Sequence, residues 1–158
     1  YTPREMLERL VGMPTVSRDS NLTLIAFVRD YLAAHGVVAR LVDSECGTKA
    51  NLYATIGPLV EGGVVLSGHT DVVPVDGQDW STDPFTLTER DGRLYGRGTA
   101  DMKAFIAIAL ALVPDMQRLR RPVHLALSYD EEIGCLGAPR LIDALVRDVP
   151  RPAAVIVG

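Results

Sequence analysis

Five residues in this sequence have side chains that bind metal ions or transfer protons in enzymes, and each lies next to an apolar stretch: His69, Asp71, Asp101, Glu131 and Glu132. The His-x-Asp spacing lets the imidazole point at a metal ion while the carboxylate holds the other ring N–H, an arrangement common around zinc. By itself this pattern also fits an ordinary hydrogen-bonded loop pair. The metal hypothesis therefore depends on where the other three acids lie.

The segments around these residues predict that the acids and the histidine meet at one edge of a sheet. Val64–Leu66, which lies between Gly62-Gly63 and Gly68, is too short for a helix and has the β-branched residues of a buried strand. Ligands of open α/β sheets bind just beyond the carboxyl ends of such strands. His69 follows this strand directly, and Glu131 follows a second predicted strand, 122–129.

Three oxygen donors and one imidazole suit zinc or cobalt at a catalytic site. Asp101 has two oxygens and can bridge a pair of ions. Glu131 and Glu132 are adjacent, so in extended backbone they face different ways, and one can bind metal while the other acts as a general base. The glycines before Asp101 also raise the possibility of a dinucleotide site, but a carboxylate there would repel a pyrophosphate.

The remaining patterns predict an α/β fold with a mostly parallel mixed sheet flanked by helices on both faces. Helices are predicted over 3–11, from about 19–21 to 35, over 104–113 and over 139–146, and strands over 37–42, 51–56, 122–129 and 153–157. Asp91-Gly92 predicts a hairpin between 86–90 and 93–95. His35 is interpreted as a helix-end residue and His124 as a packed strand residue.

Composition excludes several classes of function. A net charge of −4 over 158 residues, with dispersed basic residues, argues against nucleic-acid binding. The longest apolar run, 104–113, is too short to cross a bilayer, so no membrane association is expected. The chain has two cysteines but no CxxC motif, and it shows no secretory signal pattern, so we expect a cytoplasmic protein. The chain begins at Tyr1 rather than Met, so this expectation does not extend to a removed leader.

Three blocks of the sequence resemble the signature motifs of the M20 metallopeptidase and deacylase family: SGHTDVVP, GRLYGRGTADMK and SYDEEIGCLG. Within that family, KANLYATIGP and DWSTDPFTLTERDGRLYGRG most resemble the acetylornithine deacetylase group. The resemblance extends along essentially the whole chain. It implies the N-terminal part of a zinc exopeptidase-like catalytic domain.

The resemblance also implies roles for the five residues. His69 binds one zinc ion with Asp71 supporting it, Asp101 bridges two ions, Glu132 binds the second ion, and Glu131 is the general base. The peptide bond after Asp101 is expected to be cis. Two Zn²⁺ per full-length subunit are expected, with Co²⁺ as a possible substitute, and the substrate is expected to be a small N-acyl amino acid, namely N-acetylornithine in arginine biosynthesis.

Family members supply further ligands beyond the strand that here ends at Gly158, and they carry an inserted dimerisation domain. Residues 1–158 are therefore expected to be a truncated portion of a homodimeric enzyme that alone binds metal weakly and is inactive. The alternatives are succinyl-diaminopimelate desuccinylase, another N-acyl-amino-acid hydrolase or dipeptidase of the family, and a non-catalytic α/β binding domain.

Overall fold

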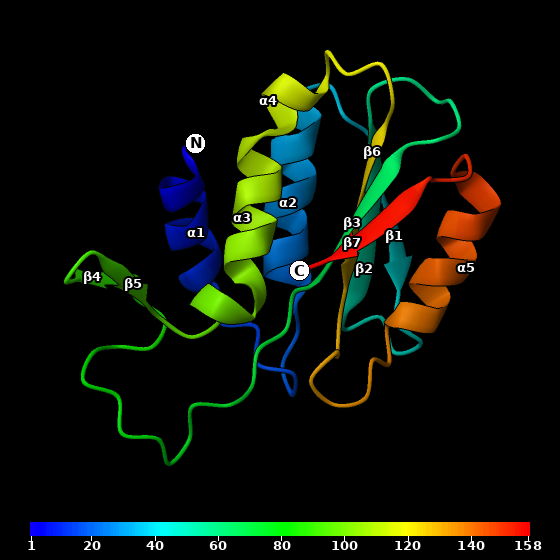
Figure 1. The fold of residues 1–158 in the computed structure, drawn as a ribbon. Helices are drawn as coiled ribbons and strands as arrows, with labels where there is room; N and C mark the ends of the chain where they lie inside the picture. The colour runs from blue at the N-terminus through cyan, green and yellow to red at the C-terminus, as the bar shows by residue number, and fades with distance from the viewer.

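The computed structural model describes all 158 residues as a central sheet with helices on both faces (Figure 1). The helices are α1 (Pro3–Val11), α2 (Leu22–Ala34), α3 (Ala104–Ala111), α4 (Val113–Met116) and α5 (Ala138–Asp148). The strands are β1 (Ala39–Asp43), β2 (Ala50–Ile56), β3 (Val64–His69), β4 (Thr88–Arg90), β5 (Arg93–Tyr95), β6 (Val123–Ser128) and β7 (Ala154–Val157). None of the helices combines the length and the apolar character needed to cross a membrane.

The central sheet is mixed and has the strand order β1-β2-β6-β3-β7. β3 runs parallel to both of its neighbours, β6 and β7, whereas β2 runs antiparallel to β1 and β6. β4 and β5 form a separate hairpin around Asp91-Gly92, as the sequence predicts. The mixed sheet flanked by helices also agrees with the prediction, although two of its four strand pairings are antiparallel, so the sheet is not mostly parallel. Its parallel part places the carboxyl ends of β3, β6 and β7 at one edge.

The two faces of the sheet are covered unequally. α1, α2 and α3 lie on one face and α5 lies on the other (Figure 1). The three-helix face contains a cluster of 21 buried apolar residues, among them Leu10, Leu32, Leu110 and Leu125. The α5 face contains a cluster of only five. Most of the apolar burial that stabilises the fold therefore lies between the sheet and α1–α3.

The first two helices begin for different reasons, one local and one tertiary. Thr2 and Glu5 form a reciprocal capping box with Pro3 in the first turn, so α1 begins where the sequence predicts. α2 also begins at the predicted place, but Asn21 does not cap it. The buried Asn21 amide instead exchanges two hydrogen bonds with the backbone of Ala50 in β2, which ties the start of α2 to the sheet.

The two histidines outside the predicted site have the structural positions that the sequence indicates. His35 follows the last turn of α2, and its ring packs edge-on against Tyr31 at 4.7 Å between centroids. His124 is fully buried in β6, where its Nδ1 lies 2.9 Å from the Thr55 hydroxyl oxygen. Burial lowers the pKa of His124, so this ring is a neutral, packed residue of the sheet.

Candidate metal centre

The site residues lie at the carboxyl-terminal edge of the parallel strands. His69 is the last residue of β3 and pairs in register with Ser128, the last residue of β6. Glu131 and Glu132 follow β6 within four residues, and Asp101 lies in the turn Thr99–Lys103 that leads into α3. Because β3 and β6 are parallel neighbours, their ends bring residues more than 60 positions apart onto one edge.

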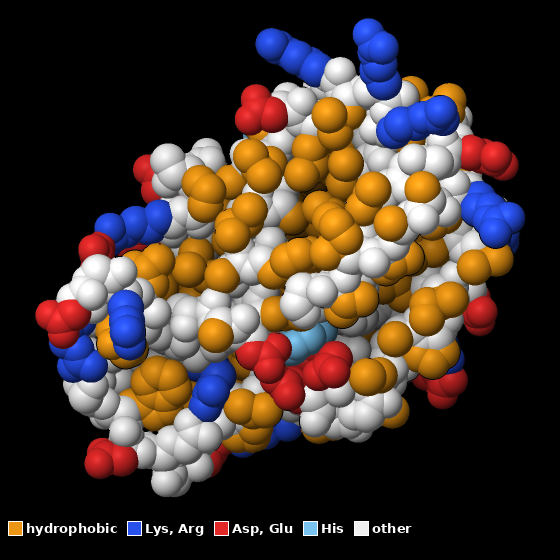
Figure 2. Space-filling model, viewed as in Figure 1, with side chains coloured by type: hydrophobic (Ala, Val, Ile, Leu, Met, Phe, Trp, Pro, Cys, Tyr) orange, Lys and Arg blue, Asp and Glu red, His pale blue; other side chains and the backbone are white.

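His69, Asp101 and Glu132 converge. One donor atom from each of these side chains lies within 4.8 Å of the other two. His69 Nε2 is 2.9 Å from Asp101 Oδ1 and 3.9 Å from Glu131 Oε2. His69 is buried, whereas the side chains of Asp101 and Glu131 are 73% and 44% exposed, so the group is open to solvent on one side. Figure 2 shows acidic side chains gathered around a histidine on this face.

Asp71 holds the centre together, in a different way from the one that the sequence pattern suggests. His69 Nδ1 donates to the backbone carbonyl of Asp71 at 2.9 Å, while the Asp71 carboxylate is 3.5 Å from that nitrogen. The carboxylate instead accepts hydrogen bonds from Ser17 Oγ at 2.7 Å and from the amides of Glu131 and Glu132 at 3.0 and 3.3 Å. Asp71 thus links the end of β3 to the loop that carries both glutamates.

The charges of these groups are strongly coupled. Burial opposes ionisation of Asp71, but the nearby His69 imidazole and the hydrogen bonds from Ser17 and the two glutamate amides lower the pKa of Asp71 to about 2. Burial likewise opposes protonation of His69, yet Asp71 and Asp101 raise the pKa of its imidazole to about 9. Burial, followed by the charge of Asp101, raises the pKa of Glu132. A cation placed among these carboxylates would relieve their mutual repulsion.

Residues before and after Asp101 hold the turn that contains it. The peptide bond between Asp101 and Met102 is cis, as the family resemblance implies. Gly98 precedes the turn at a φ of +83°, where an added Cβ would lie 2.8 Å from a methyl group of Val72. Lys103 is fully buried, and its ammonium donates to the carbonyls of Leu10 and Met13 at 2.9 and 2.8 Å. Burial lowers the pKa of Lys103 to about 7.

Sequence reasoning missed the supporting side chains Ser17 and Lys103. Their partners are 54 to 93 positions away along the chain, so no local pattern marks them.

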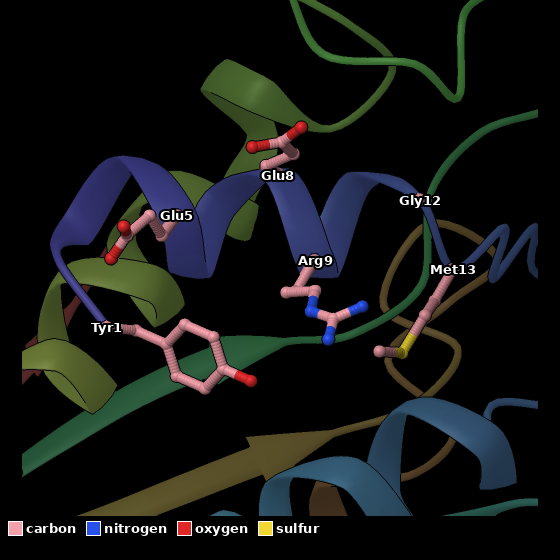
Figure 3. Close-up of a pocket in the computed structure, with 6 residues that line it drawn as sticks. All are labelled: Tyr1, Glu5, Glu8, Arg9, Gly12 and Met13. Atoms are coloured by element: carbon pink, nitrogen blue, oxygen red, sulfur yellow. The ribbon is translucent and has the colours of Figure 1, made fainter.

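A hollow beside α1 is separate from the metal cluster (Figure 3). The charged and exposed residues Glu5, Glu8 and Arg9 line much of this hollow, and none of its lining residues belongs to the cluster.

The donor set fits a divalent metal ion. Zinc takes imidazole nitrogen and carboxylate oxygen at about 2.0 to 2.2 Å and keeps an open position at catalytic sites. The three donor atoms, within 4.8 Å of one another, can reach one such ion by small side-chain movements. His69 Nδ1 is occupied by a carbonyl, so Nε2 is the ring nitrogen left for a metal, which would have to displace the proton there.

This arrangement defines a class: an α/β domain with a candidate metal site at the carboxyl-terminal edge of its parallel strands, as in metal-dependent hydrolases. The family model of peptidase family M20/M25/M40 matches the sequence over residues 65–158. The chain belongs to this family.

Two curated relatives are similar along nearly the whole chain. The acetylornithine deacetylase of Pasteurella multocida (strain Pm70) is 40% identical over 163 aligned residues, and that of Shigella sonnei (strain Ss046) is 38% identical over 164. Each alignment covers 98% of this chain but 42% of the relative. The chain therefore spans about two fifths of the length of the relatives it matches.

Solved structures of the family have the same fold. Human carnosine dipeptidase 1 superposes on 99% of this chain with a TM-score of 0.83 and 26% identity, which accounts for 38% of that protein. An M20 family metallo-carboxypeptidase from Sulfolobus solfataricus superposes on 98% with a TM-score of 0.79 and 25% identity, which accounts for 36% of that protein. The mixed sheet and its flanking helices are thus those of M20 catalytic domains.

Proposed function

We propose that the whole protein is a metal-dependent hydrolase that removes the acetyl group of N-acetylornithine, giving ornithine and acetate for arginine biosynthesis. One observation carries the proposal: a cluster of His69, Asp101 and Glu132 beside Glu131, in a chain 40% identical to an acetylornithine deacetylase. A small N-acyl amino acid is the substrate class, and the cytoplasm is the proposed location.

His69, Asp101 and Glu132 would hold the metal, with zinc as the expected ion and cobalt as a substitute. When bound, such an ion polarises a carbonyl group and lowers the pKa of water. Glu131 is the proposed general base, and its nearness to the site supports this role: its Oε2 lies 3.9 Å from His69 Nε2 and its side chain is 44% exposed. It can take a proton from water and deliver it to the leaving amine. Asp71 positions both glutamates through their amides.

We also propose that the functional enzyme needs more chain than residues 1–158. The matched relatives are more than twice as long, and β7 at the edge of the sheet is exposed along its whole length. A pair of zinc ions sharing Asp101 would require ligands from the remaining portion, which would also contain a dimerisation domain. Residues 1–158 alone should then bind zinc weakly and hydrolyse no acyl amino acid.

Glu131→Gln in the full-length protein tests the proposed general base. The carboxamide keeps the shape but cannot take a proton, so kcat on N-acetylornithine should fall by at least about 100-fold. Zinc content, measured by atomic emission, should stay the same because Glu131 is not a proposed ligand. Glu89→Gln, on the exposed β4 strand, is the matched control and should keep full activity. Unchanged turnover in Glu131→Gln would favour a different base, whereas no turnover in the unsubstituted protein would favour a non-catalytic binding domain.

A dipeptidase is the second candidate, because human carnosine dipeptidase 1 shares the fold closely at 26% identity. Rates on N-acetylornithine, N-succinyl-diaminopimelate and a dipeptide such as carnosine, measured side by side at one enzyme concentration, separate the alternatives. We expect the highest kcat/KM on N-acetylornithine. A higher value on either of the other substrates would reassign the substrate while leaving the metal site in place.

A further inference from the structure

The residue directly before the two glutamates is held in a specific backbone conformation. Asp130 is buried and has a φ of +57°, in the left-handed region that aspartate tolerates better than most residues. The chain changes direction here, between the end of β6 and the loop with Glu131 and Glu132. The position of Asp130 therefore determines where the next two residues lie.

A lysine from a different part of the sheet holds Asp130. Lys49 comes just before β2, and its ammonium lies 2.6 Å from Asp130 Oδ1, with both side chains largely buried. The same ammonium donates to the backbone carbonyl of Ser17. Ser17 in turn donates its hydroxyl to Asp71. One ammonium thus joins three segments that surround the metal centre.

This network contacts the loop with the glutamates at two places. Asp71 accepts the amides of Glu131 and Glu132, and Lys49 holds the preceding carboxylate. A buried ion pair adds little net stability over an apolar pair of similar volume, because both charges lose their hydration. What such a pair does supply is a fixed distance and direction between two segments.

We propose that Lys49 is a positioning residue of the metal centre, and that its ion pair with Asp130 sets the place of Glu131 and Glu132 relative to His69. This inference rests on the proposed function for the identity of the centre. Lys49 contacts none of the proposed metal ligands directly, and it acts through Asp130 and Ser17.

The test compares Lys49→Met, Lys49→Arg and Asp130→Asn in the full-length protein. Zinc affinity is measured by competition with a chromophoric chelator, and hydrogen exchange of the Glu131 and Glu132 amides is measured by NMR without metal. Lys49→Met should weaken zinc binding by about 10-fold or more, as loss of groups that orient metal ligands does. It should also speed exchange of both amides. Lys49→Arg keeps the charge and should recover part of both properties.

Arg140→Met is the matched control. Arg140 forms an exposed ion pair with Glu45, which lies in the same connection between β1 and β2 as Lys49 but does not contact Asp130. Its loss should change neither zinc affinity nor amide exchange. Circular dichroism with temperature identifies conditions in which each variant is folded.

Unchanged zinc affinity in folded Lys49→Met would overturn the proposal. If Lys49→Met does not fold, Asp130→Asn provides the test, because it keeps the side-chain shape while removing the ion pair. Wild-type zinc affinity and wild-type amide exchange in Asp130→Asn would also overturn the proposal. If the unsubstituted full-length protein binds no zinc, the proposed metal site fails. The amide exchange then still shows whether Lys49 holds the loop.

Discussion

The two faces of the central sheet are built differently, and the candidate metal centre contains residues that lead into helices on both. The face under α1, α2 and α3 has 21 clustered buried residues, whereas the face under α5 has five. An apolar groove remains open between α5 and β7, lined by Leu141, Leu145, Val155 and other apolar residues. Figure 2 shows apolar side chains gathered over α3, β7 and α5, above the acidic group.

This difference separates the acidic residues of the candidate site by how their elements are held in the fold. Asp101 leads into α3, which packs in the larger core, while Glu131 and Glu132 lead into α5, which covers the thinner face. The loop with the glutamates is held by polar contacts, those of Asp71 and of Asp130 with Lys49. The turn with Asp101 is held by the buried Lys103 and by the apolar packing of α3, which follows it. Three further measurements test the comparison.

Leu110→Ala should have the largest effect on stability. Leu110 is fully buried in α3, and its loss should lower the free energy of unfolding by about 3 to 5 kcal/mol through lost burial and a cavity. Urea denaturation measures this change. Ile108→Ala on the same helix, where the side chain is 49% exposed, should cost less than about 1 kcal/mol. Equal losses for the two variants would contradict the assignment of the main core to this face.

Leu141→Ala should have an intermediate effect. Leu141 is buried on α5, but it borders the open groove, so its neighbours can relax into the space. We expect a loss of about 2 kcal/mol in urea denaturation, at the low end for a buried leucine. The control is Ile142→Ala, whose side chain is 55% exposed and whose loss should change little. A loss at Leu141 as large as that at Leu110 would mean that the two faces contribute equally.

Asp148→Asn should have the smallest effect, and one that depends on pH. Hydrogen bonds from Arg147 and from Tyr53 of β2 lower the pKa of Asp148 from 3.8 to about 2. Because folding lowers this pKa, the ionised carboxylate stabilises the fold above about pH 4, and that stabilisation is lost as the pH falls toward 2. The variant should therefore melt at a lower temperature than the parent at pH 7 but at the same temperature near pH 2.

The control for this measurement is Asp143→Asn, an exposed acid on α5 for which the structure shows no ion pair. It should melt like the parent at both pH values. A difference between Asp148→Asn and the parent that persisted at pH 2 would show that the carboxylate charge does not hold the end of α5 to β2.

The elements of the fold were largely predictable because their signals are local. The capping box of Thr2 and Glu5 and the Asp91-Gly92 turn each lie within a few residues. The side-chain partner of Asn21 was not predictable: this residue reads as a helix cap but bonds to Ala50. A tertiary hydrogen bond replaced the local one that its residue type favours.

The sequence by itself determined which side chains can bind a metal or move a proton, since His69, Asp101, Glu131 and Glu132 have that chemistry wherever they lie. It also indicated that they follow strands or precede a helix. Only the tertiary structure decided which atoms meet: that Asp71 accepts the glutamate amides, that Lys49 holds Asp130, and that Lys103 is buried against α1. These contacts join residues 60 to 93 positions apart, and hydrogen bonds at such separations leave no periodic pattern in a sequence.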